Sequence, residues 1–225
     1  MTLHTIQPLN NVPDDFGPDD YPERSEKDWD EPLASAFIES IRQNYPKDLI
    51  LLEEWTTNSQ DFNNPIKDEK FTSAQADKIN GLSRIINGYR IPENMRTYRA
   101  ISMKTYRRFM ENNKNFHEGA EVTIDEFSAT SMSQNASRKT IEDFARYKSI
   151  RPVEFEFLVP AGSNAIPLSK APPYDPGTGH SVYEFKKEWL LQRGTRIRVL
   201  TKTEFQNGGI RIVALVIDTS CPKEI

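Results

Sequence analysis

Three short stretches of the sequence carry side chains that can act together on a phosphorylated sugar. "RTYRAIS" places Arg99 in a β-like run, "EFSATSMS" gathers hydroxyls at Ser128, Thr130 and Ser131, and "KKEWLLQRG" sets Glu188 before an apolar run. An arginine offers a planar fork for a phosphate, and hydroxyls can hold a carboxylate in one orientation. A carboxylate held in this way can stabilise positive charge that develops on a sugar.

Each of these features also has an ordinary structural interpretation when it is taken alone. Arg99 can be an ion-paired strand residue, the hydroxyls can belong to an edge strand, and Glu188 can be a solvated partner of Lys186 or Lys187. Their combination and their order along the chain are therefore what indicate a site.

Other chemical signatures are missing from the sequence. The three histidines, His4, His117 and His180, lie far apart and lack the spacing of zinc ligands, so we expect no metal site. The chain has no G-x-S-x-G elbow, no Walker loop and no G-x-G-x-x-G after a strand. These absences argue against the common hydrolase, kinase and dehydrogenase classes. The single cysteine, Cys221, excludes an internal disulfide and indicates a reducing compartment.

The charge of the chain is unevenly distributed. Residues 1–32 hold nine acidic residues against Arg24 and Lys27, together with five of the fifteen prolines, which predicts an extended arm. The remaining residues, 33–225, are only mildly basic, which is too little to indicate a nucleic-acid surface by charge alone. We expect them to form a single domain with a helical part over 33–96 and a β part over 97–225. The beginning of the chain lacks the basic and apolar regions of a secretion signal, and no apolar run approaches the roughly 18 to 20 residues that span a bilayer.

Helical periodicity dominates the first part of this domain. The first predicted helix starts at Glu31 and has Pro32 at its first position, and the second lies within "DLILLEEWT". The third has Thr72 or Ser73 as its cap and an apolar stripe of Ile79, Leu82 and Ile86, and it is closed by Gly88 and Pro92.

From Thr97 onward the pattern becomes mainly that of strands. Extended segments are expected in "RTYRAIS", "EVTIDEFSATSMS", "VEFEFLVPAG", "AIPL", "EWLLQ", "TRIRVLTKTEF" and "GIRIVALVI", with helices in "KTYRRFMENN" and "RKTIEDFARY". The alternation in "VEFEFLVPAG" predicts a half-buried strand. A loop rich in Pro and Gly lies between Leu168 and Tyr183 and leads to Glu188. Helices followed by strands favour an α+β fold with a largely antiparallel sheet or sandwich.

In these motifs the chain resembles the mono-ADP-ribosyltransferases of the bacterial-toxin and phage type. Arginine, Ser-Thr-Ser and glutamate motifs occur in this order in that family, on a split β-sandwich, and the resemblance runs from about Leu49 to Val216. It implies an enzyme that moves ADP-ribose from NAD to a macromolecular acceptor and releases nicotinamide. NAD would be the substrate, and no metal would be needed.

The resemblance also implies roles for individual residues. Arg99 would bind a phosphate of NAD, with Tyr98 supporting its strand, although Ala100 replaces the family's usual glycine after the arginine. Phe144 could stack on nicotinamide and Arg146 could reach a phosphate, with helical packing and a surface charge as the equal alternatives for these two residues.

The hydroxyl motif departs from the family at one position. Thr130 and Ser131 match its second and third members, but Ala129 replaces the first serine, which in the family holds the catalytic glutamate. Either Ser128 or Ser131 must then hold Glu188, or the glutamate is held less firmly.

The residues before Glu188 bear on the choice of acceptor. Lys186 stands where family members that modify arginine carry a glutamate, and an ammonium would repel an incoming guanidinium. In an extended segment Glu184, Lys186 and Glu188 share one face, so Glu184 can substitute, and Phe185 lies between them. We expect a neutral or anionic acceptor: a hydroxyl, a carboxylate or a nucleic-acid group.

Two other functions stay open at this point. The protein can be an NAD glycohydrolase with water as acceptor, or an inactive module that only binds. The resemblance favours an acceptor on a host protein and leaves a nucleic-acid acceptor open, with no membrane partner. It implies action in the cytoplasm of a bacterial or host cell after delivery by a phage or a secretion machine.

Overall fold

The fold was obtained as a computed structural model that describes residues 31–134, 152–168, 171–172, 188–206, 208–220 and 222–225. Five helices lie in these ranges: α1 (Glu31–Asn44), α2 (Pro46–Thr57), α3 (Gln60–Asp68), α4 (Ser73–Asn87) and α5 (Met103–Asn112). Eight strands lie in the same ranges: β1 (Met95–Ser102), β2 (Glu121–Ile124), β3 (Ser128–Ser131), β4 (Pro152–Val159), β5 (Ala165–Pro167), β6 (Glu188–Leu191), β7 (Thr195–Glu204) and β8 (Ile210–Asp218). The order of helices and strands confirms the predicted α+β class.

The strands form one sheet that is divided into two parts. Their order is β2-β7-β8-β4-β1-β3-β6-β5, and all neighbours are antiparallel except β4 and β8. β1 and β4 pair along their whole length, whereas β1 and β3 meet at the single pair Tyr98↔Ser131. The sheet therefore separates into a five-stranded part ending at β1 and a three-stranded part of β3, β6 and β5, as expected for a split sandwich.

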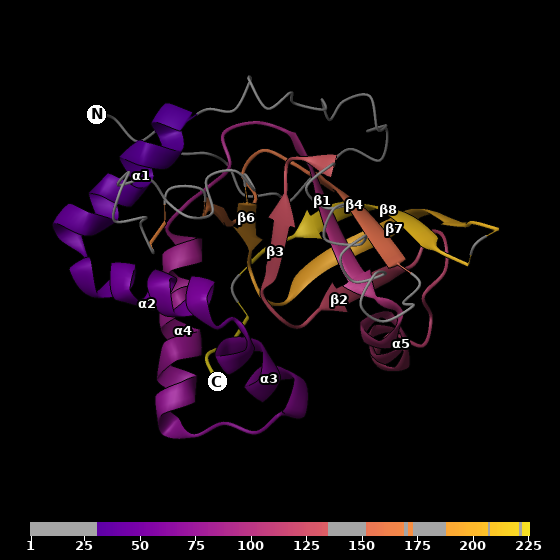
Figure 1. The fold of residues 1–225 in the computed structure, drawn as a ribbon, viewed down its shortest axis with the longest axis horizontal. Coiled ribbons are helices and arrows are strands. Elements are labelled where there is room, and N and C mark those ends of the chain that lie inside the picture. The colour runs from indigo at the N-terminus through magenta and orange to yellow at the C-terminus, as the bar shows by residue number, and fades with distance from the viewer. Residues whose placement is uncertain (1–30, 135–151, 169–170, 173–187, 207, 221) are drawn as a thin grey trace.

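Two apolar cores hold these parts together. One core packs side chains of the five-stranded part, such as Phe155 and Phe157, against Trp189 and Leu191 of the three-stranded part. The other lies between the helices and the opposite face of β3, β5 and β6. In Figure 1, α1 to α4 gather beside β3 and β6, while α5 lies near β1 and β2. The helical part is thus built onto the three-stranded part of the sheet.

Helix α4 follows the predicted signals. The Thr72 hydroxyl accepts a hydrogen bond from the backbone N–H of Gln75, and the Gln75 side chain returns one to Thr72, which completes a capping box. The stripe formed by Ile79, Leu82 and Ile86 is fully buried. The predicted helices at α1, α2 and α5 are also present, whereas α3 was not predicted.

Two strand predictions need correction. "EVTIDEFSATSMS" is not one extended segment, because the chain turns after β2 and places β3 in the other part of the sheet. β4 is not half-buried either, since Glu154 and Glu156 are buried on its second face. Glu156 pairs there with Arg96, at 3.2 Å, and with Arg211, and this hydrogen bond raises the pKa of Arg211. Ion pairing therefore permits the burial of Glu156 on a face that the sequence pattern assigned to solvent.

Several predictions fall outside the described residues. These are the arm up to residue 30, the helix in "RKTIEDFARY", and most of the loop before Glu188. Among the residues that the structure does describe, no helix has the length and apolar character needed to cross a membrane.

Candidate active site

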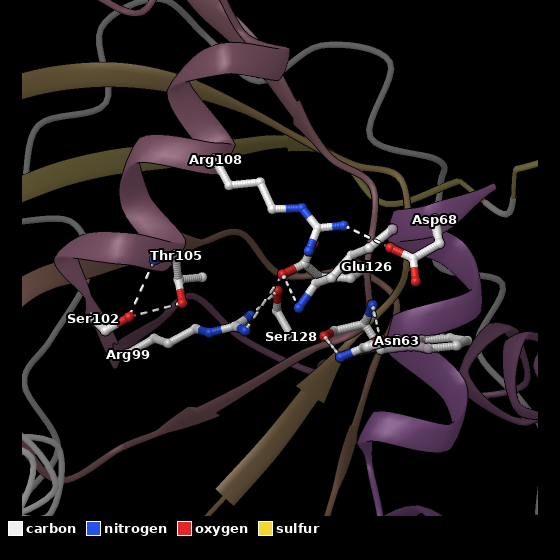
Figure 2. Close-up of polar contacts among 10 residues, drawn as sticks. Asn63, Asp68, Arg99, Ser102, Thr105, Arg108, Glu126 and Ser128 are labelled. Atoms are coloured by element: carbon white, nitrogen blue, oxygen red, sulfur yellow. Dashed lines mark hydrogen bonds and ion pairs between the residues drawn. The ribbon is translucent and has the colours of Figure 1, made fainter.

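Arg99 lies in β1 and is held by groups at the start of β3. Its Nη1 donates a hydrogen bond to Oγ of Ser128, and its Nη2 lies 3.9 Å from Oε1 of Glu126. The same carboxylate oxygen lies 3.3 Å from Nζ of Lys67, which belongs to α3. Figure 2 shows the Arg99 side chain extending from β1 toward Ser128 and Glu126. The arginine therefore stands between the sheet and the helical part of the molecule.

The environment of Arg99 has opposing effects on its charge. Burial lowers the pKa of the guanidinium, and the nearby Glu126 carboxylate raises it. Because the ordinary pKa of arginine lies far above neutrality, Arg99 keeps its positive charge. A partly desolvated cation of this kind attracts an anionic ligand more strongly than a fully solvated one.

A cavity of about 550 Å³ opens beside Arg99, between α3, α5 and the sheet. Four basic side chains line it, from three different elements: Lys67, Arg99, Lys104 and Arg108. Two acidic side chains, Asp125 and Glu126, line it as well. Arg108 also pairs with Asp68 of α3 at 3.0 Å, and Figure 2 draws this contact as a dashed line. The cavity has the size of a small-ligand pocket and an excess of positive charge that suits phosphate groups.

A side chain from α3 fixes the segment that contacts Arg99. Nδ2 of Asn63 donates to the carbonyl oxygen of Phe127, and the Phe127 N–H donates to Oδ1 of Asn63, both at 3.1 Å. Asn63 and Phe127 are buried. Since Glu126 and Ser128 flank Phe127, this pair of hydrogen bonds sets the positions of both Arg99 partners.

Glu188 is the first residue of β6, and it lies directly opposite Ser131, the last residue of β3. Ser131 in turn lies opposite Tyr98 of β1, whose side chain is buried. Thr130 is turned toward β6, because its hydroxyl donates to the carbonyl oxygen of Trp189 at 3.3 Å. Ser131 is therefore the motif hydroxyl aligned with the predicted catalytic carboxylate.

The two serines of the hydroxyl motif have different neighbours. Ser128 contacts Arg99 and lies opposite Leu191, whereas Ser131 lies opposite Glu188. Because side chains alternate along a strand, the Arg99–Ser128 pair and the Glu188–Ser131 pair leave opposite faces of these strands. The second pair stands at the last residue of β3 and the first residue of β6.

Some predicted site residues lie outside the described part of the chain: Phe144, Arg146, Glu184, Phe185 and Lys186.

Other residues near Arg99 were not predicted from the sequence. They are four residues that line the cavity, Lys67, Lys104, Arg108 and Glu126, and Asn63, which fixes Phe127. Lys104 and Arg108 are four residues apart on a predicted helix, which is a signal that could have placed them on one face. Asn63 and Lys67 carried no such signal, because α3 was not predicted.

Comparison with known proteins identifies the family. The family model described as ADP-ribosyltransferase exoenzyme matches residues 19–220, so the chain belongs to that family. It is accordingly an NAD-dependent mono-ADP-ribosyltransferase of the bacterial-toxin type, as the resemblance in sequence implied. No curated protein matches the sequence.

Solved structures of bacterial toxins share the fold. C3stau2 from S. aureus, solved with NAD, is 19% identical, with 83% of this chain and 95% of that chain covered and a TM-score of 0.59. Plx2a, an ADP-ribosyltransferase toxin from Paenibacillus larvae, is 16% identical over 87% and 96% of the two chains, with a TM-score of 0.64. The C3 exoenzyme of Clostridium limosum is 14% identical over 87% and 95%, with a TM-score of 0.62.

Proposed function

We propose that NAD binds with its diphosphate in the cavity beside Arg99 and with its nicotinamide ribose next to Glu188. The observation that carries this proposal is the arrangement around β3. Ser128 of this strand accepts a hydrogen bond from Arg99, the candidate for phosphate binding, and Ser131 lies opposite Glu188, the candidate catalytic acid. The basic side chains of the cavity supply the charge that two phosphates require.

The proposed reaction is a glycosyl transfer. The bond between the ribose C1′ and the nicotinamide nitrogen breaks, and nicotinamide leaves as a neutral molecule with the electron pair. The ribose then carries positive charge, and the Glu188 carboxylate stabilises it and accepts a hydrogen bond from a ribose hydroxyl. The acceptor attacks C1′ and loses its proton, which completes the transfer of ADP-ribose.

Within this proposal, Ser131 is a positioning residue for Glu188. It lies opposite the carboxylate in the β3–β6 pair, and its own hydroxyl accepts a hydrogen bond from the backbone N–H of Ser133 at 3.0 Å. That contact orients the hydroxyl, so Ser131 can do what the first serine of the family motif does elsewhere. Ala129 then causes no loss of function at this site.

The proposed acceptor is a protein side chain with a neutral or anionic reacting group. This part rests on Lys186, which precedes Glu188 by two residues, and on the repulsion between an ammonium and a guanidinium. Transfer of ADP-ribose to agmatine at a rate close to that of transfer to protein would contradict it.

The test is to incubate the protein with labelled NAD, with and without a cell lysate, and to compare it with Glu188→Gln. We expect nicotinamide release and label on a discrete protein band, and both should depend on Glu188. Release of nicotinamide without labelled macromolecule would favour NAD hydrolysis. The absence of both signals from a correctly folded protein would contradict the proposed activity.

A further inference from the structure

The carboxylate of Glu126 bridges two cations that belong to the proposed phosphate site. Its Oε1 lies 3.3 Å from Nζ of Lys67 and 3.9 Å from Nη2 of Arg99. The side chains of Glu126, Arg99 and Lys67 are 18%, 20% and 23% exposed, so solvent screens these charges only in part. The carboxylate thus occupies the position at which a phosphate oxygen would meet both cations.

A bound phosphate would affect the two contacts of Arg99, with Ser128 and with Glu126, in different ways. The Ser128 hydroxyl is neutral, and a phosphate bound to the other nitrogens of the guanidinium can leave this hydrogen bond intact. Glu126 is an anion at the outer limit of ion-pair distance. A phosphate offers two short charge-assisted hydrogen bonds, and each is stronger than the loose contact with Glu126.

Glu126 cannot move far away when a ligand arrives. Its backbone precedes Phe127, whose N–H and carbonyl are both fixed by Asn63. Only the side chain can rotate, so its negative charge stays close to any phosphate bound at Arg99. Such a charge opposes the binding of an anion, because like charges at short range repel each other.

We propose that Glu126 is an internal anion that competes with the diphosphate of the donor for Arg99 and Lys67 and thereby limits donor affinity. This inference rests on the proposed function, since it takes the cavity as the site of the NAD diphosphate. It also assigns a consequence to binding: the donor displaces Glu126 from Lys67 and so loosens one contact between α3 and the segment that precedes β3.

The orientation of Arg99 argues against the opposite role, in which Glu126 would help to bind the donor. Ser128 contacts the guanidinium more closely than Glu126 does, and its own position is fixed by the sheet through its pairing with Leu191. Removal of the Glu126 charge therefore leaves the fork of Arg99 in place and makes two cations available to the phosphates.

The experiment compares Glu126→Gln with Asp125→Asn. Both variants remove one negative charge from adjacent positions in the lining of the same cavity, but only Glu126 makes the two ion-pair contacts described above. The probe is ADP-ribose, which carries the diphosphate and has no nicotinamide to lose, and binding is measured by titration calorimetry. We expect Glu126→Gln to tighten the binding of ADP-ribose by about threefold to tenfold. Asp125→Asn should tighten it by a clearly smaller factor, because it removes a charge from the lining without freeing Arg99 or Lys67 from an ion pair.

Two further variants complete the design. Glu126→Asp keeps the charge but shortens the side chain by one methylene, so its affinity for ADP-ribose should lie between the affinities of the wild type and of Glu126→Gln. This variant also replaces Glu126→Gln if Glu126→Gln does not fold. Arg99→Lys reports on the proposed function itself. Binding of ADP-ribose that is absent or independent of Arg99 would overturn the proposed function and this inference together.

Failure of the inference alone has a different signature. ADP-ribose would then bind in a manner that depends on Arg99, but Glu126→Gln would bind it equally or more weakly, or both charge-removing variants would tighten it to the same extent. The first result would show that Glu126 has no effect on donor affinity or increases it. The second would show that Glu126 acts only through the overall charge of the cavity. Either result overturns the specific competition proposed here.

Discussion

Ser131 and Glu188 are direct partners in the β3–β6 pair, and each stands at the end of its strand. Three residues before Ser131, Ser128 accepts a hydrogen bond from Arg99. One four-residue strand therefore contacts both halves of the proposed site, with one serine for each half. Substitution of these two serines should affect different kinetic constants.

Ser131→Ala and Ser128→Ala form a matched pair of hydroxyl deletions. We expect Ser131→Ala to lower kcat for nicotinamide release by about tenfold, because Glu188 would lose the hydroxyl that we propose orients it. Ser128→Ala should instead raise KM for NAD by about tenfold with a smaller change in kcat, because Arg99 loses its hydrogen bond. Steady-state kinetics of both variants give the test, and a reversed pattern would show that Ser128 holds the glutamate.

Glu188→Gln should lower turnover by roughly 10² to 10³, as the removal of one preorganised electrostatic group does in other enzymes. Glutamine has the same shape, so the fold and the binding of NAD should be preserved while the charge proposed to stabilise the ribose is lost. Nicotinamide release under saturating NAD measures the effect. Glu121→Gln, which removes a carboxylate on β2 that pairs with Arg196 and Arg198, is the control and should retain activity. A loss of less than about tenfold for Glu188→Gln, with an unchanged melting temperature, would remove Glu188 from the mechanism.

Arg99→Lys tests the requirement for a planar fork. A lysine keeps the positive charge but cannot make two parallel hydrogen bonds to a phosphate, and it would also lose the present geometry with Ser128. We expect KM for NAD to rise by about tenfold to a hundredfold, with kcat changed by much less. Arg107→Lys on the exposed side of α5 is the matched control. Equal KM values for Arg99→Lys and the wild type would place the phosphates elsewhere.

The elements predicted correctly are those whose signals are local. Thr72 and Gln75 encode the start of α4 by themselves, and the apolar stripe that follows encodes the buried face. Helix α3 has no comparable signal, because it contains two asparagines and Pro65 in its interior. It is stabilised by contacts with residues of other elements, such as the edge-to-face packing of Phe62 on Trp55 of α2, whose ring centroids lie 5.5 Å apart.

The same distinction separates the site residues. Arg99, Ser131 and Glu188 could be proposed from the sequence because each stands in a short motif, although only the strand register places Ser131 opposite Glu188. Lys67 and Glu126 reach the site through a contact between residues 59 positions apart, and the sequence order gives no sign of it. The burial of Glu156 was missed for a similar reason, because its arginine partners, Arg96 and Arg211, lie on other strands.

Asn63 connects the helical part to the active site, and its removal should affect stability and donor binding together. Asn63→Ala leaves the N–H and the carbonyl of Phe127 buried without their partner, and each loss carries a desolvation cost. We expect the free energy of unfolding to fall by about 2 to 4 kcal/mol. KM for NAD should also rise at temperatures at which the variant is folded, because Ser128 loses its fixed position and with it the hydrogen bond that holds Arg99. Asn64→Ala is the matched control for stability: it makes the same substitution at the next position of α3, where the side chain is exposed and lines the cavity, and alanine favours the helix. Urea denaturation and steady-state kinetics measure both quantities. If Asn63→Ala were as stable as Asn64→Ala, the two hydrogen bonds would have no role in joining α3 to β3.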